Sequence, residues 1–268
     1  MHRRNLILQG PPGVGKTLVA SRLADSLVGR RDPENVLFVQ FHPSYAYEDF
    51  VQGWRPREGG GFELRDGPFR DICDRALQDK DDTYVLVIDE INRGNLGKVF
   101  GELMMLLEAD KRDPRWGVRL QYDGTASPKF HVPPNLILIG TMNTADRSLA
   151  LVDYALRRRF AFAAIGPQFD EPAFAAHLVA LGASSALIGR IRARLARVNE
   201  LISSDDALGD GFLIGHSHFC SRPPATTAYD EDWFRTLVEF EIGPLLREYW
   251  FDRVDRAEEA IAALQMEV

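Results

Sequence analysis

A chain of 268 residues, of which 45% are hydrophobic and 26% charged, has the composition of an ordinary globular protein and can form one large domain or two smaller ones. Its formal charge of −7 argues against a surface devoted mainly to nucleic acid or to an anionic membrane. Cys73 and Cys220 fit no metal or redox spacing, and no apolar run approaches the roughly 18 residues that span a bilayer. We therefore expect a cytoplasmic protein without a membrane segment.

The first element along the chain is a glycine-rich loop at residues 10–17, with the sequence GPPGVGKT. It fits G-x-x-x-x-G-K-[ST] at every fixed position, follows an apolar run at residues 6–8 and leads into a helical pattern at residues 18–27. In this setting, backbone N–H groups and the helix N-terminus surround a phosphate chain, the lysine reaches the β- and γ-phosphates, and the threonine hydroxyl binds Mg²⁺. We predict a nucleoside triphosphate site at Gly10, Pro11, Pro12, Gly13, Val14, Gly15, Lys16, Thr17 and Leu18.

Apolar runs then alternate with helical patterns as far as residue 164. Strands are expected at residues 35–40, 84–88, 136–140 and 160–164, with helices at residues 69–77, 95–108 and about 149–158. A loop or hairpin is expected at residues 53–67, and two hairpin arms at residues 117–122 and 129–132. Strands that are apolar throughout and alternate with helices favour an α/β fold, in which a parallel sheet has helices on both faces.

The pattern changes after Gly166 and Pro167. Helical spacing of apolar residues then dominates, at residues 171–181, 186–202, 231–241 and 253–264. We predict an α/β nucleotide-binding core at residues 1–167 and a small α-helical lid domain at residues 168–268.

Polar residues follow two of the predicted strands. Asp89 and Glu90 follow the strand at residues 84–88, and Asn143 follows the strand at residues 136–140. Ligands bind at the carboxyl ends of parallel strands, where the glycine-rich loop also lies. Asp89 can hold Mg²⁺ together with Thr17, and Glu90 can polarise a water that attacks the γ-phosphate. Asn143 can orient that water; the alternatives are solvated loop carboxylates and an asparagine that only shapes a turn.

Arginines at two places are candidates for a role in a neighbouring copy of the chain. Arg158 and Arg159 end a short helix with Arg157, and Arg93 follows the Asp89–Glu90 pair. Basic residues at a helix C-terminus can also form local ion pairs, so both interpretations stay open.

The glycine-rich loop, the Asp-Glu pair, the asparagine after the next strand and the trailing helical lid together resemble the AAA+ family. Longer stretches at residues 41–45, 88–95 and 101–103, and above all the run MNTADRS at residues 142–148, resemble its McrB branch. McrB is the motor subunit of the McrBC restriction systems, which cleave DNA that contains modified cytosine. The resemblance covers nearly the whole chain.

The resemblance implies a five-stranded sheet in the order 5-1-4-3-2, a nucleotide between core and lid, and a ring, usually a hexamer. It implies GTP rather than ATP as the fuel, with Mg²⁺, and stimulation by an McrC-like nuclease subunit. Asn143 and Asp146 would help to place the attacking water and receive that stimulation. Arg158 or Arg159, together with Arg93, would serve the neighbour's nucleotide.

The resemblance is incomplete at two places. McrB proteins carry an N-terminal domain that reads modified DNA, whereas the glycine-rich loop begins ten residues into this chain. We therefore expect a domain of a longer protein that contacts DNA only indirectly. Residues 215–218, GHSH, occupy the place of the usual AAA+ lid arginine. An ATP-driven remodelling chaperone of the MoxR kind, and a nucleotide-gated assembly module with little turnover, are the alternative functions.

Overall fold

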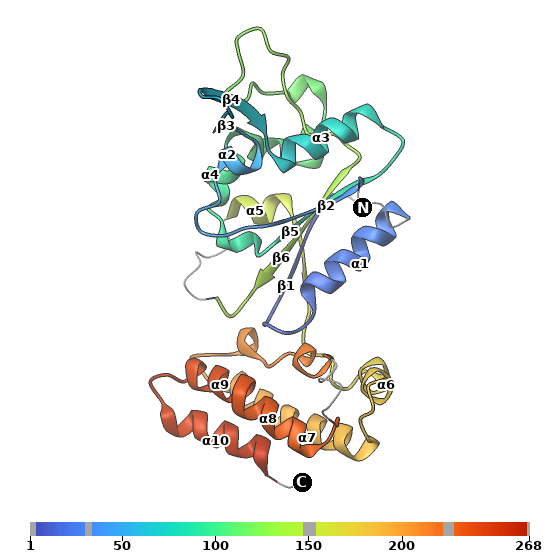
Figure 1. The fold of residues 1–268 in the computed structure, drawn as a ribbon, viewed down its shortest axis with the longest axis vertical. Coiled ribbons are helices and arrows are strands. Elements are labelled where there is room, and N and C mark those ends of the chain that lie inside the picture. The colour runs from blue at the N-terminus through green and yellow to red at the C-terminus, as the bar shows by residue number, and fades with distance from the viewer. Residues whose placement is uncertain (1–3, 30–33, 147–153, 222–227, 267–268) are drawn as a thin grey trace. The chain divides into compact units, whose positions relative to one another are not determined.

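A computed structural model of the chain describes residues 4–29, 34–146, 154–221 and 228–266 (Figure 1). By their internal contacts the residues form two compact units. The core unit comprises residues 1–9 and 16–164, and the lid unit comprises residues 10–15 and 165–268. The glycine-rich loop up to residue 15 therefore groups with the lid unit, and Lys16 groups with the core unit. None of the helices in the described parts of the chain is long and apolar enough to cross a membrane.

The core unit is built on a five-stranded parallel sheet. Its strands are β1 (Asn5–Gly10), β2 (Val36–Gln40), β5 (Tyr84–Asp89), β6 (Leu136–Asn143) and β7 (Ala161–Ala164), in the order β2-β5-β6-β1-β7. In chain order these five strands read 2-3-4-1-5, which is the expected 5-1-4-3-2 sheet read from its other edge. Strand β5, which lies between β2 and β6, is buried from Tyr84 to Ile88 because α1 (Lys16–Val28) and α3 (Pro68–Gln78) both pack on it. The predicted α/β class is confirmed.

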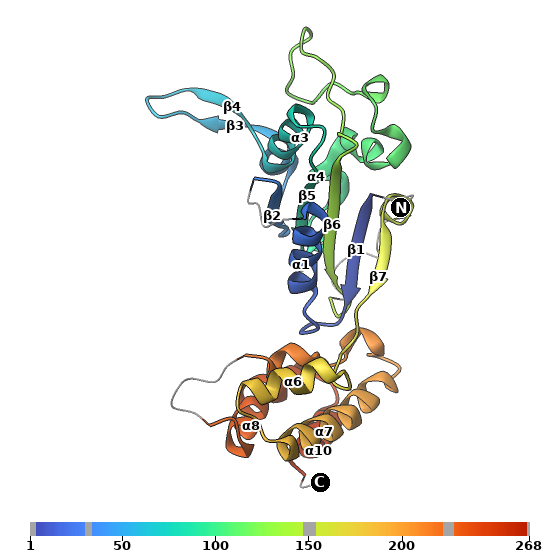
Figure 2. The ribbon, with the colours of Figure 1, turned by 90° about the vertical axis from the view of Figure 1, so that its right-hand side faces the viewer.

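A hairpin of β3 (Gln52–Pro56) and β4 (Phe62–Asp66) extends from the core, as Figure 2 shows. Three glycines with φ of +94°, +98° and +84°, Gly59, Gly60 and Gly61, form its turn. The hairpin follows the short helix α2 (Tyr47–Phe50), and the Arg55 guanidinium donates to Glu48 O at 2.9 Å. The hairpin expected at residues 53–67 is therefore present, as a sheet of its own.

Two expectations for the core were wrong in extent. The helix expected at residues 95–108 ends early: α4 spans Leu96–Phe100, and a 3₁₀ segment covers Gly101–Leu107. Gly101 has a φ of +49°, which an α-helix cannot accommodate. The hairpin arms expected at residues 117–132 reduce, in the described parts of the chain, to one antiparallel bridge between Val118 and Phe130. Residues 149–153 of the helix expected at about 149–158 lie outside the described residues, and the described part of that range forms α5 (Tyr154–Arg159).

The lid unit is helical. Its helices are α6 (Pro172–Ala180), α7 (Ser185–Ser203), α8 (Glu231–Leu237), α9 (Gly243–Tyr249) and α10 (Val254–Gln265). The long helix α7 buries Leu187, Ile191 and Leu195 and packs against α6 and α10. The helix expected at residues 231–241 is longer than predicted because a π-helical turn at Val238–Ile242 joins α8 to α9.

Candidate nucleotide-binding site

The glycines of the loop between β1 and α1 stand where the backbone conformation or the available space disfavours any other residue. Gly13 and Gly15 have φ of +74° and +78°, in the left-handed region that other residues avoid. A Cβ atom on Gly10 would lie 2.1 Å from the carbonyl oxygen of Ile165. A Cβ on Gly15 would meet no atom within 4 Å, so the loop borders open space at that point. The loop thus has the conformation of a phosphate-binding loop, with space beside it for an anion.

Lys16 begins α1 and is buried, with 7% of its surface exposed. Its Nζ donates a 2.5 Å hydrogen bond to Oδ1 of Asn143 at the end of β6. Burial lowers the pKa of Lys16, and the Glu90 and Asp89 carboxylates oppose that shift. A partly desolvated ammonium group at a loop of this kind suits an anionic phosphate ligand.

Thr17 and Asp89 form the second part of the site. Oγ1 of Thr17 donates to Oδ1 of Asp89 at 2.9 Å, which joins the start of α1 to the end of β5. The same carboxylate oxygen accepts a 2.5 Å hydrogen bond from Thr141 on β6. Hydroxyl and carboxylate oxygens are the ligands Mg²⁺ prefers, and Mg²⁺ usually keeps few protein ligands beside phosphate and water. Thr17 and Asp89 therefore fit the predicted metal.

Thr141 was not among the predicted site residues. Besides its bond to Asp89, its hydroxyl accepts a 3.1 Å hydrogen bond from the backbone N–H of Glu90. The sequence alone could have identified it. Thr141 is two residues before Asn143, and side chains two residues apart in a strand lie on the same face.

Glu90 lies beside Asn143, whose Nδ2 donates to Glu90 Oε1. It has φ +53° and ψ +44°, and it is the one non-glycine residue with positive φ in the described parts of the chain. Such a conformation costs of the order of 1–3 kcal/mol and is concentrated at functional sites. Burial raises the pKa of Glu90, which the neighbouring Arg93 partly offsets. A carboxylate with a raised pKa is a better proton acceptor.

Arg93 and Asp146 lie next to Glu90. The Arg93 guanidinium is 3.4 Å from Glu90 Oε2 and 3.2 Å from Asp146 Oδ2. Both contacts lie within one chain, so in this structure Arg93 orients the carboxylates of its own site. A role for Arg93 in a neighbour's site stays a prediction. Of the run at residues 142–148, Arg147 and Ser148 lie outside the described residues.

The arginines at the end of α5 have different surroundings. The Arg159 guanidinium pairs with Glu108 at 2.9 Å and is 15% exposed. The Arg159 carbonyl accepts a 2.9 Å hydrogen bond from the buried Asn5 side chain. Arg158 is exposed, and among the described residues no carboxylate forms an ion pair with it. The structure therefore anchors Arg159 in its own core unit and leaves Arg158 at the surface.

Within the lid unit, the segment at residues 215–218 packs on the glycine-rich loop. The Ser217 N–H donates to Gly13 O at 2.8 Å. A Cβ on Gly215 would lie 2.1 Å from the Gly13 backbone, so a side chain there would separate the two segments. Leu18, the last predicted nucleotide contact, is 62% exposed on α1.

A phosphate-binding loop after the first strand of a 2-3-4-1-5 parallel sheet, with a buried lysine and a Thr–Asp pair beside it, defines the chain as a P-loop nucleoside triphosphatase. The family description of the AAA domain (dynein-related subfamily) matches residues 5–160, and the chain belongs to this family. The description of the McrB alpha-helical lid domain matches residues 190–258. The chain is thus an McrB-like AAA+ protein.

Two relatives are subunits of restriction enzymes. The chain is 50% identical to the type IV methyl-directed restriction enzyme EcoKMcrB subunit of Escherichia coli (strain K12), over 93% of this chain and 54% of that protein. It is 29% identical to the type II restriction enzyme BsuMI component YdiS of Bacillus subtilis (strain 168), over 59% of this chain and 56% of that protein. The aligned region covers about half the length of each relative.

Proposed function

We propose that the chain is the motor domain of an McrBC-type restriction system, which hydrolyses GTP in a ring and is stimulated by an McrC-like nuclease subunit. The observation that supports this most is the chain of contacts Lys16–Asn143–Glu90, which joins a phosphate-binding lysine, a polar amide and a candidate base at one edge of the sheet. The restriction enzymes among the relatives support the biological setting.

In this proposal, residues 1–167 form the nucleotide-binding core and residues 168–268 form the lid. The N–H groups of the glycine-rich loop and the Lys16 ammonium bind the phosphates, and Thr17 and Asp89 bind Mg²⁺. The metal neutralises charge that develops on the phosphate oxygens. Glu90 accepts the proton of the attacking water, and Asn143 orients that water by hydrogen bonds. Asp146 holds Arg93 against Glu90.

A second copy of the chain completes the site. Removal of a neighbour's arginine from a phosphoryl-transfer site slows hydrolysis strongly, because that cation stabilises the transition-state charge. Arg158 is the candidate, since it is exposed whereas Arg159 is paired with Glu108. A closed ring, which we propose to be a hexamer, places each Arg158 at the next subunit's nucleotide.

DNA enters this proposal through other parts of the system. The surplus of negative charge on the chain does not favour direct DNA binding. A DNA-reading domain elsewhere in the protein and the nuclease subunit would make the DNA contacts. Because the motor consumes a nucleoside triphosphate, we place it in the cytoplasm.

Steady-state turnover of GTP and of ATP, with and without an McrC-like protein, tests the proposal. We expect GTP to be the preferred substrate and its turnover to rise at least about tenfold with the partner, because an assembled site supplies cations that the isolated chain lacks. Preference for ATP together with indifference to the partner would instead favour an ATP-driven remodelling chaperone. Assembly driven by a slowly hydrolysed analogue, with negligible turnover of GTP and ATP, would favour a nucleotide-gated assembly module.

A further inference from the structure

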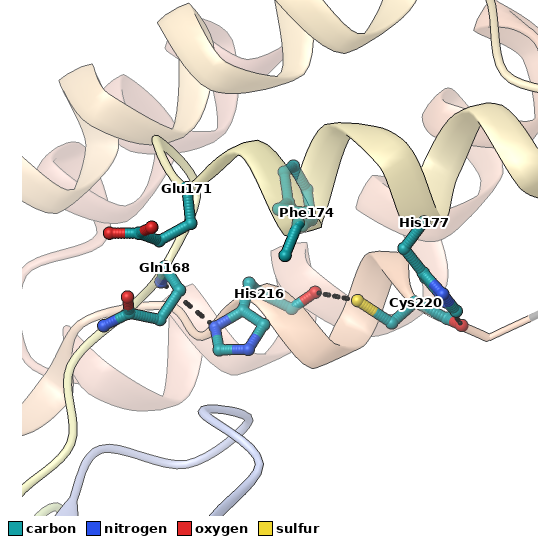
Figure 3. A pocket seen from close by; sticks show the side chains of 7 residues that line it. Gln168, Glu171, Phe174, His177, His216 and Cys220 are labelled. Carbon is teal, nitrogen blue, oxygen red and sulfur yellow. Dashed lines mark hydrogen bonds between the residues drawn. The ribbon is translucent and has the colours of Figure 1, made fainter.

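The lid unit contains a pocket between α6 and the 3₁₀ turn His216–Phe219, which Figure 3 shows. His216 Nδ1 accepts a 3.1 Å hydrogen bond from the Gln168 N–H, and His177 Nε2 lies 2.9 Å from the Cys220 carbonyl oxygen. These contacts join segments of the lid unit to one another. A second polar cluster is buried in the core unit, and it contacts α5.

The core cluster centres on Asn5, which begins β1 and is buried, with 2% of its surface exposed. Its Nδ2 donates two 2.9 Å hydrogen bonds, to the backbone carbonyls of Leu107 and Arg159. Its Oδ1 accepts a 2.6 Å hydrogen bond from Nη2 of Arg112. The amide is fixed in one orientation, because only Nδ2 can donate to the carbonyls and only Oδ1 can accept from the guanidinium.

Arg112 is a buried cation, with 5% of its surface exposed. Besides Asn5, it donates to the backbone carbonyls of Leu136 and Pro133. Within the described parts of the chain, no carboxylate forms an ion pair with it. Burial lowers the pKa of Arg112 to about 10, so it stays charged at neutral pH. A buried charge is tolerated only when its donors are paired, so Arg112 holds the Asn5 oxygen in place.

The cluster anchors the end of α5 at two points. The Arg159 carbonyl is bound by Asn5, and the Arg159 guanidinium pairs at 2.9 Å with Glu108. Glu108 directly follows Leu107, the other residue whose carbonyl Asn5 binds. The described helix α5 is six residues long, and a helix this short has little stability of its own. Its direction therefore depends on these anchors, and the exposed Arg158 directly precedes Arg159.

We propose that Asn5 and Arg112 are positioning residues, which hold α5 so that Arg158 meets the nucleotide of the neighbouring subunit. The inference rests on the proposed role of Arg158. Asn5 begins β1, and the phosphate-binding loop follows the other end of that strand. A defect at Asn5 should therefore spare the nucleotide site of its own chain and impair the site of the next subunit.

Asn5→Asp tests this assignment. The carboxylate keeps the size of the side chain and can still bind Arg112, but it cannot donate to the Arg159 and Leu107 carbonyls. We expect GTP turnover of the assembled chain to fall at least about tenfold, because a small displacement of a group that acts on the reaction is costly. The affinity of a single chain for GTP should not change.

Asn35→Asp is the matched control. Asn35 is also a buried asparagine at the start of a strand, 4% exposed, and its Nδ2 donates to the Thr83 carbonyl at 3.3 Å. It precedes β2, which β5 and β6 separate from β1. The same substitution there removes a buried donor without touching α5, so Asn35→Asp rings should keep wild-type turnover.

Mixed rings separate an effect on the neighbour from an effect on the chain's own site. In equal mixtures with Glu90→Gln, half of the sites retain Glu90 and half of those face a correctly held Arg158, so turnover should recover to about a quarter of the wild-type rate. In mixtures with Arg158→Ala, no subunit presents a correctly held arginine, and turnover should not exceed that of Asn5→Asp alone. Recovery with Arg158→Ala but not with Glu90→Gln would place the defect in the chain's own site and overturn the proposal.

The mixture of Glu90→Gln with Arg158→Ala distinguishes failure of this inference from failure of the proposed function. If that mixture regains activity and Asn5→Asp turns over GTP at the wild-type rate, Arg158 acts on the neighbour and the role of Asn5 is wrong. If that mixture stays inactive, both roles fall. Should Asn5→Asp not assemble, Arg112→Lys enters the same mixtures with the same expectations, since it keeps the charge but loses the planar fork of donors. Wild-type turnover by Arg112→Lys would then overturn the proposal.

Discussion

Replacing Arg158 with alanine is expected to slow steady-state GTP hydrolysis by about 10³-fold or more, with little change in the affinity of a single chain for nucleotide. The reason is geometric. Arg158 is exposed at the end of α5, and in the described parts of the chain it has no carboxylate partner, so its charge is available to another subunit. Multiple-turnover assays at a protein concentration that supports assembly, alongside single-chain binding titrations, provide the measurement.

The neighbouring arginines supply the comparison. Arg157 lies over the Phe162 ring at 5.6 Å, so Arg157→Ala should keep wild-type turnover. Arg159→Ala leaves Glu108 without its partner and should lower the unfolding temperature. If Arg158→Ala turns over GTP at the wild-type rate, Arg158 does not act in the neighbouring subunit's site, and another residue must supply the cation there.

Glu90→Gln is expected to bind GTP as wild type does and to hydrolyse it about 10²–10⁴-fold more slowly. The amide keeps the size of the side chain and can still contact Asn143, but it cannot accept the proton of the attacking water. The single-turnover rate of GTP, measured with chain in excess over nucleotide, isolates this step from product release.

Asp146→Asn is the comparison for Glu90→Gln, since it also neutralises one carboxylate near Arg93. We expect a smaller rate loss, because Asp146 acts on Glu90 through Arg93 and does not contact the water. Undiminished single-turnover hydrolysis by Glu90→Gln would exclude Glu90 as the base.

Local patterns in the sequence were sufficient to predict the α/β class, the strands and the helical lid. A strand that is apolar along its whole length, such as β5, must be covered on both faces, and this alone favours a parallel sheet. The carboxyl ends of parallel strands share one edge, so the proximity of Lys16, Asp89 and Asn143 could also be anticipated. The strand order came from family resemblance, because spacing along the chain does not determine which strands are neighbours.

Long-range contacts account for what the sequence did not reveal. The left-handed conformation of Glu90 depends on its environment, including the bond from its N–H to Thr141, 51 residues away. The difference between Arg158 and Arg159 depends on Glu108 and Asn5, which come from other elements. The break at Gly101 was missed because a single glycine inside a helical pattern is often tolerated. Except for the break at Gly101, which is a local feature, no local pattern contains these relations.

The mixture of two inactive variants tests the central claim most directly, because hydrolysis in the proposed ring requires Glu90 of one subunit and Arg158 of the next. In rings assembled from equal amounts of Glu90→Gln and Arg158→Ala chains, half of the sites retain Glu90 and half of those face an intact Arg158. We predict that GTP turnover recovers to about a quarter of the wild-type rate. A mixture that assembles into rings and stays as inactive as its two components would contradict the account.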